Sequence, residues 1–191
     1  MRSILVALLS LFVLSAHAQM IEDFEESTWE WNEYASKKQE AIIKDGKMHV
    51  MSKTEEPVIV FCYAPLDIQD AFVLQCDVFV KKIDDEKEFG IVLDYQDDEN
   101  YLAFMVKEGL ARFEQWKEGR LVGNFNATIK LKEQKNTTVA LRIDAEPERL
   151  KFSVNGMKAL ERRFLTLHSN GIGFKVGGKQ SVDFDNLSID Q

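Results

Sequence analysis

Five residues in the middle of the chain combine aromatic rings with charged groups, as sugar-binding sites do. They are Asp94, Tyr101, Arg112, Glu114 and Trp116. An aromatic ring stacks on the apolar face of a pyranose, carboxylate and guanidinium groups hydrogen-bond its hydroxyls, and binding sites collect Trp and Arg. The alternative is an exposed sheet face with a salt bridge from Arg112 to Glu114 or Asp94, covered by the two aromatics.

Patterns for other kinds of chemistry are weak in this sequence. His49 and His168 are isolated, so we expect surface residues rather than members of a catalytic triad. No His-x-x-x-His or Cys-x-x-Cys spacing occurs, which argues against a transition-metal site, and no glycine-rich phosphate loop precedes a helix. Glu86 and Glu88 flank Lys87 in what we interpret as a solvated acidic turn. We expect that no cofactor is required.

The segments around these residues alternate apolar and polar side chains with a period of two, which predicts β-strands. Strand-length segments of this kind are 58–63, 72–81, 89–95, 101–107, 110–116, 139–144, 150–154, 172–176 and 182–189. Asp45-Gly46 and Asn155-Gly156 supply the positive φ of tight hairpin turns between further strand-like runs. Only 39–44 and 161–167 resemble helices. Strands at this spacing indicate an all-β sandwich or barrel.

The same alternation assigns side chains to the two faces of the sheet. One assignment satisfies the strands 89–95, 101–107 and 110–116 together. Its inward set is Phe89, Ile91, Leu93, Tyr95, Leu102, Phe104, Val106, Ala111 and Phe113. The opposite, outward face then collects Asp94, Tyr101, Arg112, Glu114 and Trp116.

Residues 1–18 have the features of a secretory signal peptide. Arg2 precedes an apolar run over 4–14, and Ala16 and Ala18 occupy the positions that a signal peptidase recognises. The run is too short to span a bilayer, which takes about 20 apolar residues. No Cys follows Ala18, which argues against a bacterial lipoprotein. We predict a secreted or periplasmic protein in which 19–191 form a single domain.

Composition limits the partners and the redox chemistry. The formal net charge of -8 argues against binding to nucleic acid or to anionic membranes, because both need clustered positive charge. Cys76 lies in an apolar row, so we favour buried thiols over a disulfide between Cys62 and Cys76. Trp29 and Trp31 share a face and are interpreted as packing residues.

Several motifs, in order, resemble those of the concanavalin A-like jelly-roll superfamily. Phe89-Gly90-Ile91-Val92-Leu93, followed by Asn100-Tyr101 and Phe104, resembles the core of its bacterial members, Val154-Asn155-Gly156 resembles their short hairpin, and Gly171–Val176 with Phe184-Asp185-Asn186-Leu187 resembles their closing strands. The resemblance covers residues 21–190. It implies a two-sheet antiparallel β-sandwich, similar to laminin-G-like modules, secreted β-glucanases and 3-keto-disaccharide hydrolase-like domains.

Two further expectations come from this resemblance. The glucanases use carboxylates about 5 Å apart in a Glu-x-Asp-x-Glu pattern on one strand. This pattern is missing here, which counts against glucanase activity. Jelly rolls of this kind often hold a structural Ca²⁺, and the resemblance points to Asp185 with Asp23, although two carboxylates fall short of roughly 6–8 oxygen ligands. The alternative is that Asp185 caps a turn or accepts from a backbone N–H.

The sequence therefore favours a secreted, non-catalytic carbohydrate-binding module with a glycan as ligand. Two alternatives stay open. One is an envelope module that packs the same face against a protein partner, and the other is a glycoside hydrolase without the glucanase carboxylates. A groove would favour the glycan, a flat apolar patch the protein, and two facing carboxylates the enzyme.

Overall fold

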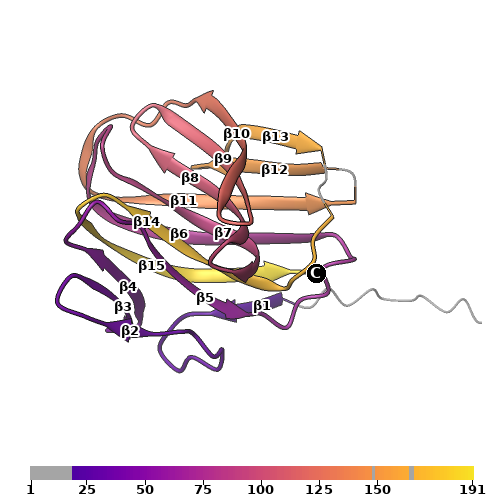
Figure 1. Cartoon of the computed structure of the whole chain (residues 1–191), viewed down its shortest axis with the longest axis horizontal. Helices are drawn as coiled ribbons and strands as arrows, with labels where there is room; N and C mark the ends of the chain where they lie inside the picture. The colour runs from indigo at the N-terminus through magenta and orange to yellow at the C-terminus, as the bar shows by residue number, and fades with distance from the viewer. Residues whose placement is uncertain (1–18, 148, 164–165) are drawn as a thin grey trace, which may run out of the picture.

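Two antiparallel β-sheets packed face to face form the protein in the computed structural model, which describes residues 19–147, 149–163 and 166–191 (Figure 1). None of the described residues forms a helix, so none of them belongs to a helix that could cross a membrane. The all-β sandwich predicted from the sequence is confirmed. The expected signal peptide lies outside the described residues.

The two sheets differ in size. The smaller sheet has the strand order β10 (Arg120–Thr128), β9 (Leu110–Lys117), β8 (Asn100–Lys107), β7 (Glu88–Asp97), β14 (Gly171–Gly177) and β5 (Val58–Tyr63). The larger sheet has the order β13 (Met157–Arg163), β12 (Arg149–Val154), β11 (Gln134–Glu146), β6 (Phe72–Ile83), β15 (Gln180–Asp190), β4 (Lys47–Ser52), β3 (Gln39–Lys44) and β2 (Tyr34–Ala35), and β1 (Gln19–Glu22) also pairs with β15. Strands distant in sequence are neighbours, as in a jelly roll.

Each strand-length segment predicted from the sequence lies within a strand. Residues 39–44, which resembled a helix, form β3 because the Asp45-Gly46 turn folds them back onto β4. Asp45 and Gly46 have φ of 51° and 66°, and Asn155 and Gly156 have φ of 50° and 73°. Positive φ at both central residues is the signature of a type I′ hairpin turn, so both turn predictions are confirmed.

The core lies between the sheets and contains the predicted inward side chains of β7, β8 and β9, with one exception. Tyr95 was expected inward but lies on the outer face of the smaller sheet, in a cluster with Val92 and Tyr101. The cause is an irregularity of β7: the register against β8 shifts between Leu93 and Asp97, and Asp94 has φ of 51°. A bulge of this kind changes the side-chain alternation beyond it.

Other packing predictions are confirmed. Cys62 and Cys76 are free thiols buried in the core. Trp31 is buried and stacks on Phe174, with ring centroids 5.3 Å apart and ring planes 9° from parallel. Trp29 packs against the same core.

Candidate functional site

A row of aromatic rings crosses the outer face of the smaller sheet. From one edge inward it consists of Tyr63 and Phe61 on β5, Tyr95 on β7, Tyr101 on β8 and Trp116 on β9. Consecutive ring centroids are 5.8, 3.9, 6.3 and 5.8 Å apart. We call these five residues the aromatic row. Tyr95 and Tyr101 are buried within the row, whereas Tyr63 is exposed and Phe61 and Trp116 are partly exposed.

Glycines in β14 make room for the row. Phe61 and Tyr95 stack on each other although β14 lies between their strands. The outward positions of β14 between them are Gly171 and Gly173. A Cβ at Gly171 would overlap the carbonyl oxygen of Tyr95, and one at Gly173 would overlap that of Val60. The glycines therefore permit a close approach that no other residue allows.

A buried ion pair lies beside the far end of the row. Lys175 Nζ donates to Glu114 Oε2 at 2.7 Å, and each side chain is 4% exposed. Lys175 Nζ also donates to Tyr101 Oη at 3.2 Å and lies 5.1 Å from the Trp116 ring centroid. Trp116 Nε1 donates to the same Glu114 oxygen at 2.9 Å. One lysine and one glutamate thus fix the positions of both aromatic rings.

Lys175 was missed in the sequence analysis, although the alternation of β14 contains a signal for it. Ile172, Phe174 and Val176 point into the core, so Lys175 must face outward. What the sequence lacks is the order of the strands. Only that order places Lys175 near Glu114, which is 61 residues away along the chain.

Arg112 connects two glutamates on this face. Its Nη2 lies 2.9 Å from Glu114 Oε1 and also pairs with Glu88 Oε2. The salt bridge anticipated between Arg112 and Glu114 is therefore present. Placing Glu88 in a solvated turn was wrong, because Glu88 begins β7 and is held by Arg112.

The protonation of Glu114 follows from these contacts. Burial alone would raise the pKa of Glu114, but the charge and hydrogen bond of Lys175, the Trp116 N–H and Arg112 outweigh it, so the pKa is lowered. Glu114 is thus an acceptor of hydrogen bonds at neutral pH. Burial raises the pKa of the Tyr101 hydroxyl, which stays protonated.

Asp94 has a different role from the one expected. It was placed on the exposed face with Arg112, but it is buried, and its Oδ1 accepts from the backbone N–H groups of His168 and Ser169 at 2.6 and 2.7 Å. Burial raises the pKa of this carboxyl. Asp94 fixes the loop before β14 and does not join the Arg112 cluster.

Two hollows border Tyr101 and Trp116. The larger, of about 480 Å³, is lined by Asn32, Tyr34, Pro57, Ile59, Asp98, Tyr101, Trp116, Gly119 and Lys175. The smaller, of about 310 Å³, is lined by Asp94, Gln96, Asn100, Tyr101, Leu102, Gln115, Trp116, Lys117, Thr166 and His168. We call the larger one the groove. Two of its lining residues, Asn32 and Tyr34, come from the N-terminal part of the chain, which was not connected with this face from the sequence.

The two carboxylates proposed for calcium each have other partners. Asp23 Oδ1 accepts from the Glu25 N–H at 3.1 Å, and Asp185 Oδ1 accepts from the Asn186 N–H at 2.8 Å. Lys47 Nζ lies 3.9 Å from Asp185 Oδ2. In the described part of the chain, no three acidic, His or Cys side chains come together as a metal site would require. A calcium site here stays a prediction from the resemblance, and we derive no function from it.

His49 contacts a carboxylate and a hydroxyl on the outer face of the larger sheet. Its Nδ1 lies 2.6 Å from Asp183 Oδ1, and its Nε2 lies 3.4 Å from Ser181 Oγ. Asp183, His49 and Ser181 therefore contact one another in the order of a catalytic triad. Catalysis by a triad also needs free N–H donors that stabilise an oxyanion. Ser181 belongs to β15, between β4 and β6, where the sheet ladder uses the backbone N–H groups. We therefore assign no catalysis to this trio.

Neither a protein-family model nor a curated protein matches the sequence. Solved structures do match. The metal-free carbohydrate recognition domain of Emp46p has a TM-score of 0.65 at 11% identity and covers 87% of this chain and 93% of its own. A Bacillus subtilis protein of unknown function with a galectin-like fold has a TM-score of 0.64 at 10% identity, with 92% and 98% covered. The fold is that of the lectin-type jelly rolls. The carbohydrate-binding module CBM66 from Bacillus subtilis has a TM-score of 0.53 at 15% identity, with 91% and 95% covered.

Proposed function

We propose that this protein binds a glycan in the groove, with Trp116 as the ring that stacks on a sugar. The observation that carries the proposal is that Trp116, Tyr101 and Lys175 line the groove together. Aromatic rings beside a few fixed polar groups are what a sugar-binding cleft requires. Several solved structures with the same fold are described as carbohydrate-recognising domains, which supports the proposal.

The polar groups of the groove suit hydroxyls. A lysine ammonium has three N–H donors, and Lys175 spends two of them on Glu114 and Tyr101. Since Lys175 also lines the groove, we assign its third N–H to a sugar hydroxyl. The charges of Lys175 and Arg112 are balanced by Glu114 and Glu88, so the ligand proposed for this face is a neutral sugar.

Hydrolysis is less well supported than binding. Glu88 and Glu114 both contact Arg112, so two carboxylates do lie close together. A glycosidase needs one of its carboxyls protonated as a general acid, with a raised pKa. The pKa of Glu114 is shifted in the opposite direction. We therefore propose a binding module.

The test begins with a glycan-array screen of the purified protein, followed by calorimetry on a hit. Trp116→Ala should weaken binding by about 2 kcal/mol or more, the scale of an interface hot spot. Trp116 is only partly buried, so its loss should cost less stability than the ~3–5 kcal/mol of a core aromatic. The denaturation midpoint of the same variant checks this second expectation.

Tyr63→Ala is the matched control. Tyr63 is 57% exposed, ends the aromatic row and does not line the groove, so its removal should leave affinity unchanged. If no glycan binds, or if Trp116→Ala binds every hit as the parent does, the groove is not a sugar site. A protein partner for this face would then be the better hypothesis.

A further inference from the structure

The groove has one acidic side chain among the described residues that line it, that of Asp98. Asp98 lies in the turn between β7, which ends at Asp97, and β8, which begins at Asn100. Its side chain is exposed, so solvent and ligands reach it. A ligand in the groove therefore meets this carboxylate.

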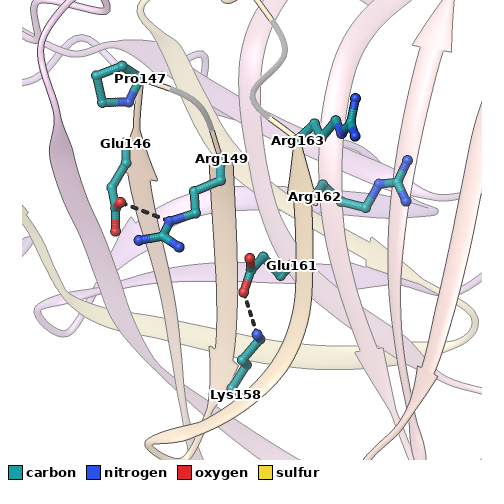
Figure 2. A pocket seen from close by; sticks show the side chains of 7 residues that line it. All are labelled: Glu146, Pro147, Arg149, Lys158, Glu161, Arg162 and Arg163. Carbon is teal, nitrogen blue, oxygen red and sulfur yellow. Dashed lines mark hydrogen bonds and ion pairs between the residues drawn. The ribbon is translucent and has the colours of Figure 1, made fainter.

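The carboxylates of a larger hollow are paired with basic side chains. This hollow, of about 1290 Å³, lies beside β11, β12 and β13. Figure 2 shows Glu146 paired with Arg149, with 2.9 Å between Oε2 and Nε. It also shows Glu161 paired with Lys158. Asp98 differs, because no lysine, arginine or histidine in the described part of the chain forms an ion pair with it. Its negative charge is therefore available to a ligand.

The carboxylate of Asp98 is held in place before any ligand arrives. The hydroxyl of Tyr95, a member of the aromatic row, donates to Asp98 Oδ1 at 2.6 Å. The turn itself is fixed by Asp97, whose Oδ1 accepts from the Glu99 N–H at 2.8 Å. A group that is already positioned loses less conformational freedom when a ligand binds.

The charge of Asp98 also acts on a groove residue from the other sheet. Tyr34 lies on β2 of the larger sheet and lines the groove. Burial, and then the negative charge of Asp98, raises the pKa of the Tyr34 hydroxyl. A charged group of a ligand in the groove would experience the same field.

From these contacts we infer that Asp98 sets the specificity of the groove, so that it accepts glycans built of neutral sugars and rejects acidic ones such as uronic acids. This inference rests on the proposed function, because it concerns the ligand of the same groove. A carboxylate has about four acceptor sites, and Tyr95 occupies one, so Asp98 can accept from sugar hydroxyls. Such charge-assisted hydrogen bonds are stronger than those between neutral groups. An acidic sugar would instead bring two negative charges together.

The test compares two probes that differ by one charge. One is the neutral oligosaccharide that gives the strongest signal in the glycan array, and the other is the same glycan with a C6 hydroxymethyl group oxidised to a carboxylate. Calorimetry on the parent protein should show the acidic glycan binding about tenfold or more weakly than the neutral one. Equal affinities, or an acidic glycan among the tightest array hits, would overturn the inference. This comparison needs no variant.

Asp98→Asn assigns the discrimination to one residue. The amide keeps the size of the side chain and an oxygen that can accept from Tyr95, but it removes the charge. The variant should bind the neutral glycan about tenfold more weakly than the parent does, the difference between a charged and a neutral hydrogen bond. It should bind the neutral and acidic glycans with nearly equal affinity.

Glu99→Gln is the matched control. It removes the same charge from the next residue of the turn, which is exposed and does not line the groove. At an ionic strength of about 0.15 M, where exposed charges are screened beyond short distances, both affinities should equal those of the parent. Equal changes in Glu99→Gln and Asp98→Asn would overturn the role of Asp98.

Trp116→Ala separates this inference from the proposed function. If Trp116→Ala weakens binding of the neutral glycan and Asp98→Asn does not, the groove is a sugar site and only the role of Asp98 is wrong. If no glycan binds, or if Trp116→Ala binds as the parent does, both the proposed function and the role of Asp98 are wrong.

Discussion

Lys175 and Glu114 hold opposite charges at 2.7 Å in a place that solvent hardly reaches. A buried ion pair adds little net stability, because desolvation offsets most of the attraction. The contacts of this pair with Tyr101 and Trp116 suggest another use. We interpret the pair as the group that fixes both rings at the groove.

Removing one partner of the pair should be costly. Lys175→Met leaves the Glu114 charge buried, and we expect a loss of about 3–5 kcal/mol in the free energy of unfolding. The double variant Lys175→Met/Glu114→Leu should recover much of that loss. Urea denaturation measures both, with the exposed Lys179→Met as control. A cost for Lys175→Met no larger than that of the control would contradict the assignment.

The pKa of Glu114 gives the pair a pH dependence. Because the folded-state pKa lies below the ordinary value of 4.5, ionised Glu114 contributes stability above that value. This contribution is lost as the pH falls through the lowered, folded-state pKa. We expect the unfolding free energy of the parent to fall more steeply over this acidic range than that of Glu114→Gln. Parallel pH profiles of the two proteins would refute the expectation.

At the scale of the elements, β14 decides the shape of the outer face. Its outward positions combine the glycines under the aromatic row with Lys175. The strand therefore provides both the close approach of Phe61 to Tyr95 and the buried charge. Loss of either glycine would separate strands that the row needs side by side.

Gly173→Ala tests this role. Its new Cβ would overlap backbone atoms of Val60 and Phe61, which cannot move as a flexible side-chain end could. We expect a loss of stability at the upper end of the range for overpacking, about 3 kcal/mol. Gly109→Ala is the control: its Cβ meets nothing within 4 Å, and its φ of 64° costs only about 1–2 kcal/mol. Equal unfolding free energies for the two variants in urea would show that the strands around Gly173 can shift to accommodate a Cβ.

The strands also show which side-chain orientations could be predicted from the sequence. The inward residues of β8 and β9 were predictable, because a regular period of two fixes a face. The outward orientation of Tyr95 was not predictable, because the sequence signals the bulge at Asp94 only by placing an Asp within a strand. The burial of Asp94 and its contacts to residues 74 and 75 positions away depend on tertiary packing that the local pattern does not encode.

For the candidate site, Tyr101, Glu114 and Trp116 could be grouped from the alternation of two neighbouring strands joined by a turn. Adding Lys175 and Tyr34 requires the strand order β8-β7-β14-β5 and the path of the N-terminal segment. These are long-range facts. A single sequence contains no direct signal for them, so the contributions of Lys175 and Tyr34 to the groove were not predicted.

At the scale of the whole molecule, the two buried thiols can show whether the two sheets unfold together. Cys62 lies on β5 of the smaller sheet and Cys76 on β6 of the larger, and both side chains point into the core between the sheets. Burial, then the charge of Glu22, raises the pKa of Cys62, and burial, then Asp77, raises that of Cys76. A thiol in such surroundings is a poor nucleophile, because the thiolate is the reactive form.

We therefore expect iodoacetamide to leave both cysteines unmodified in the native protein and to alkylate both once guanidinium chloride has unfolded it, without any reductant. Intact mass counts the added groups, and peptide mapping assigns them. Because both thiols face one core, they should become reactive over the same range of denaturant as the far-UV circular dichroism is lost. Alkylation of Cys62 alone at low denaturant would show that β5, an edge strand, opens independently of the sandwich. Failure of both to react after unfolding would instead reveal a disulfide, contrary to the free thiols of the structure.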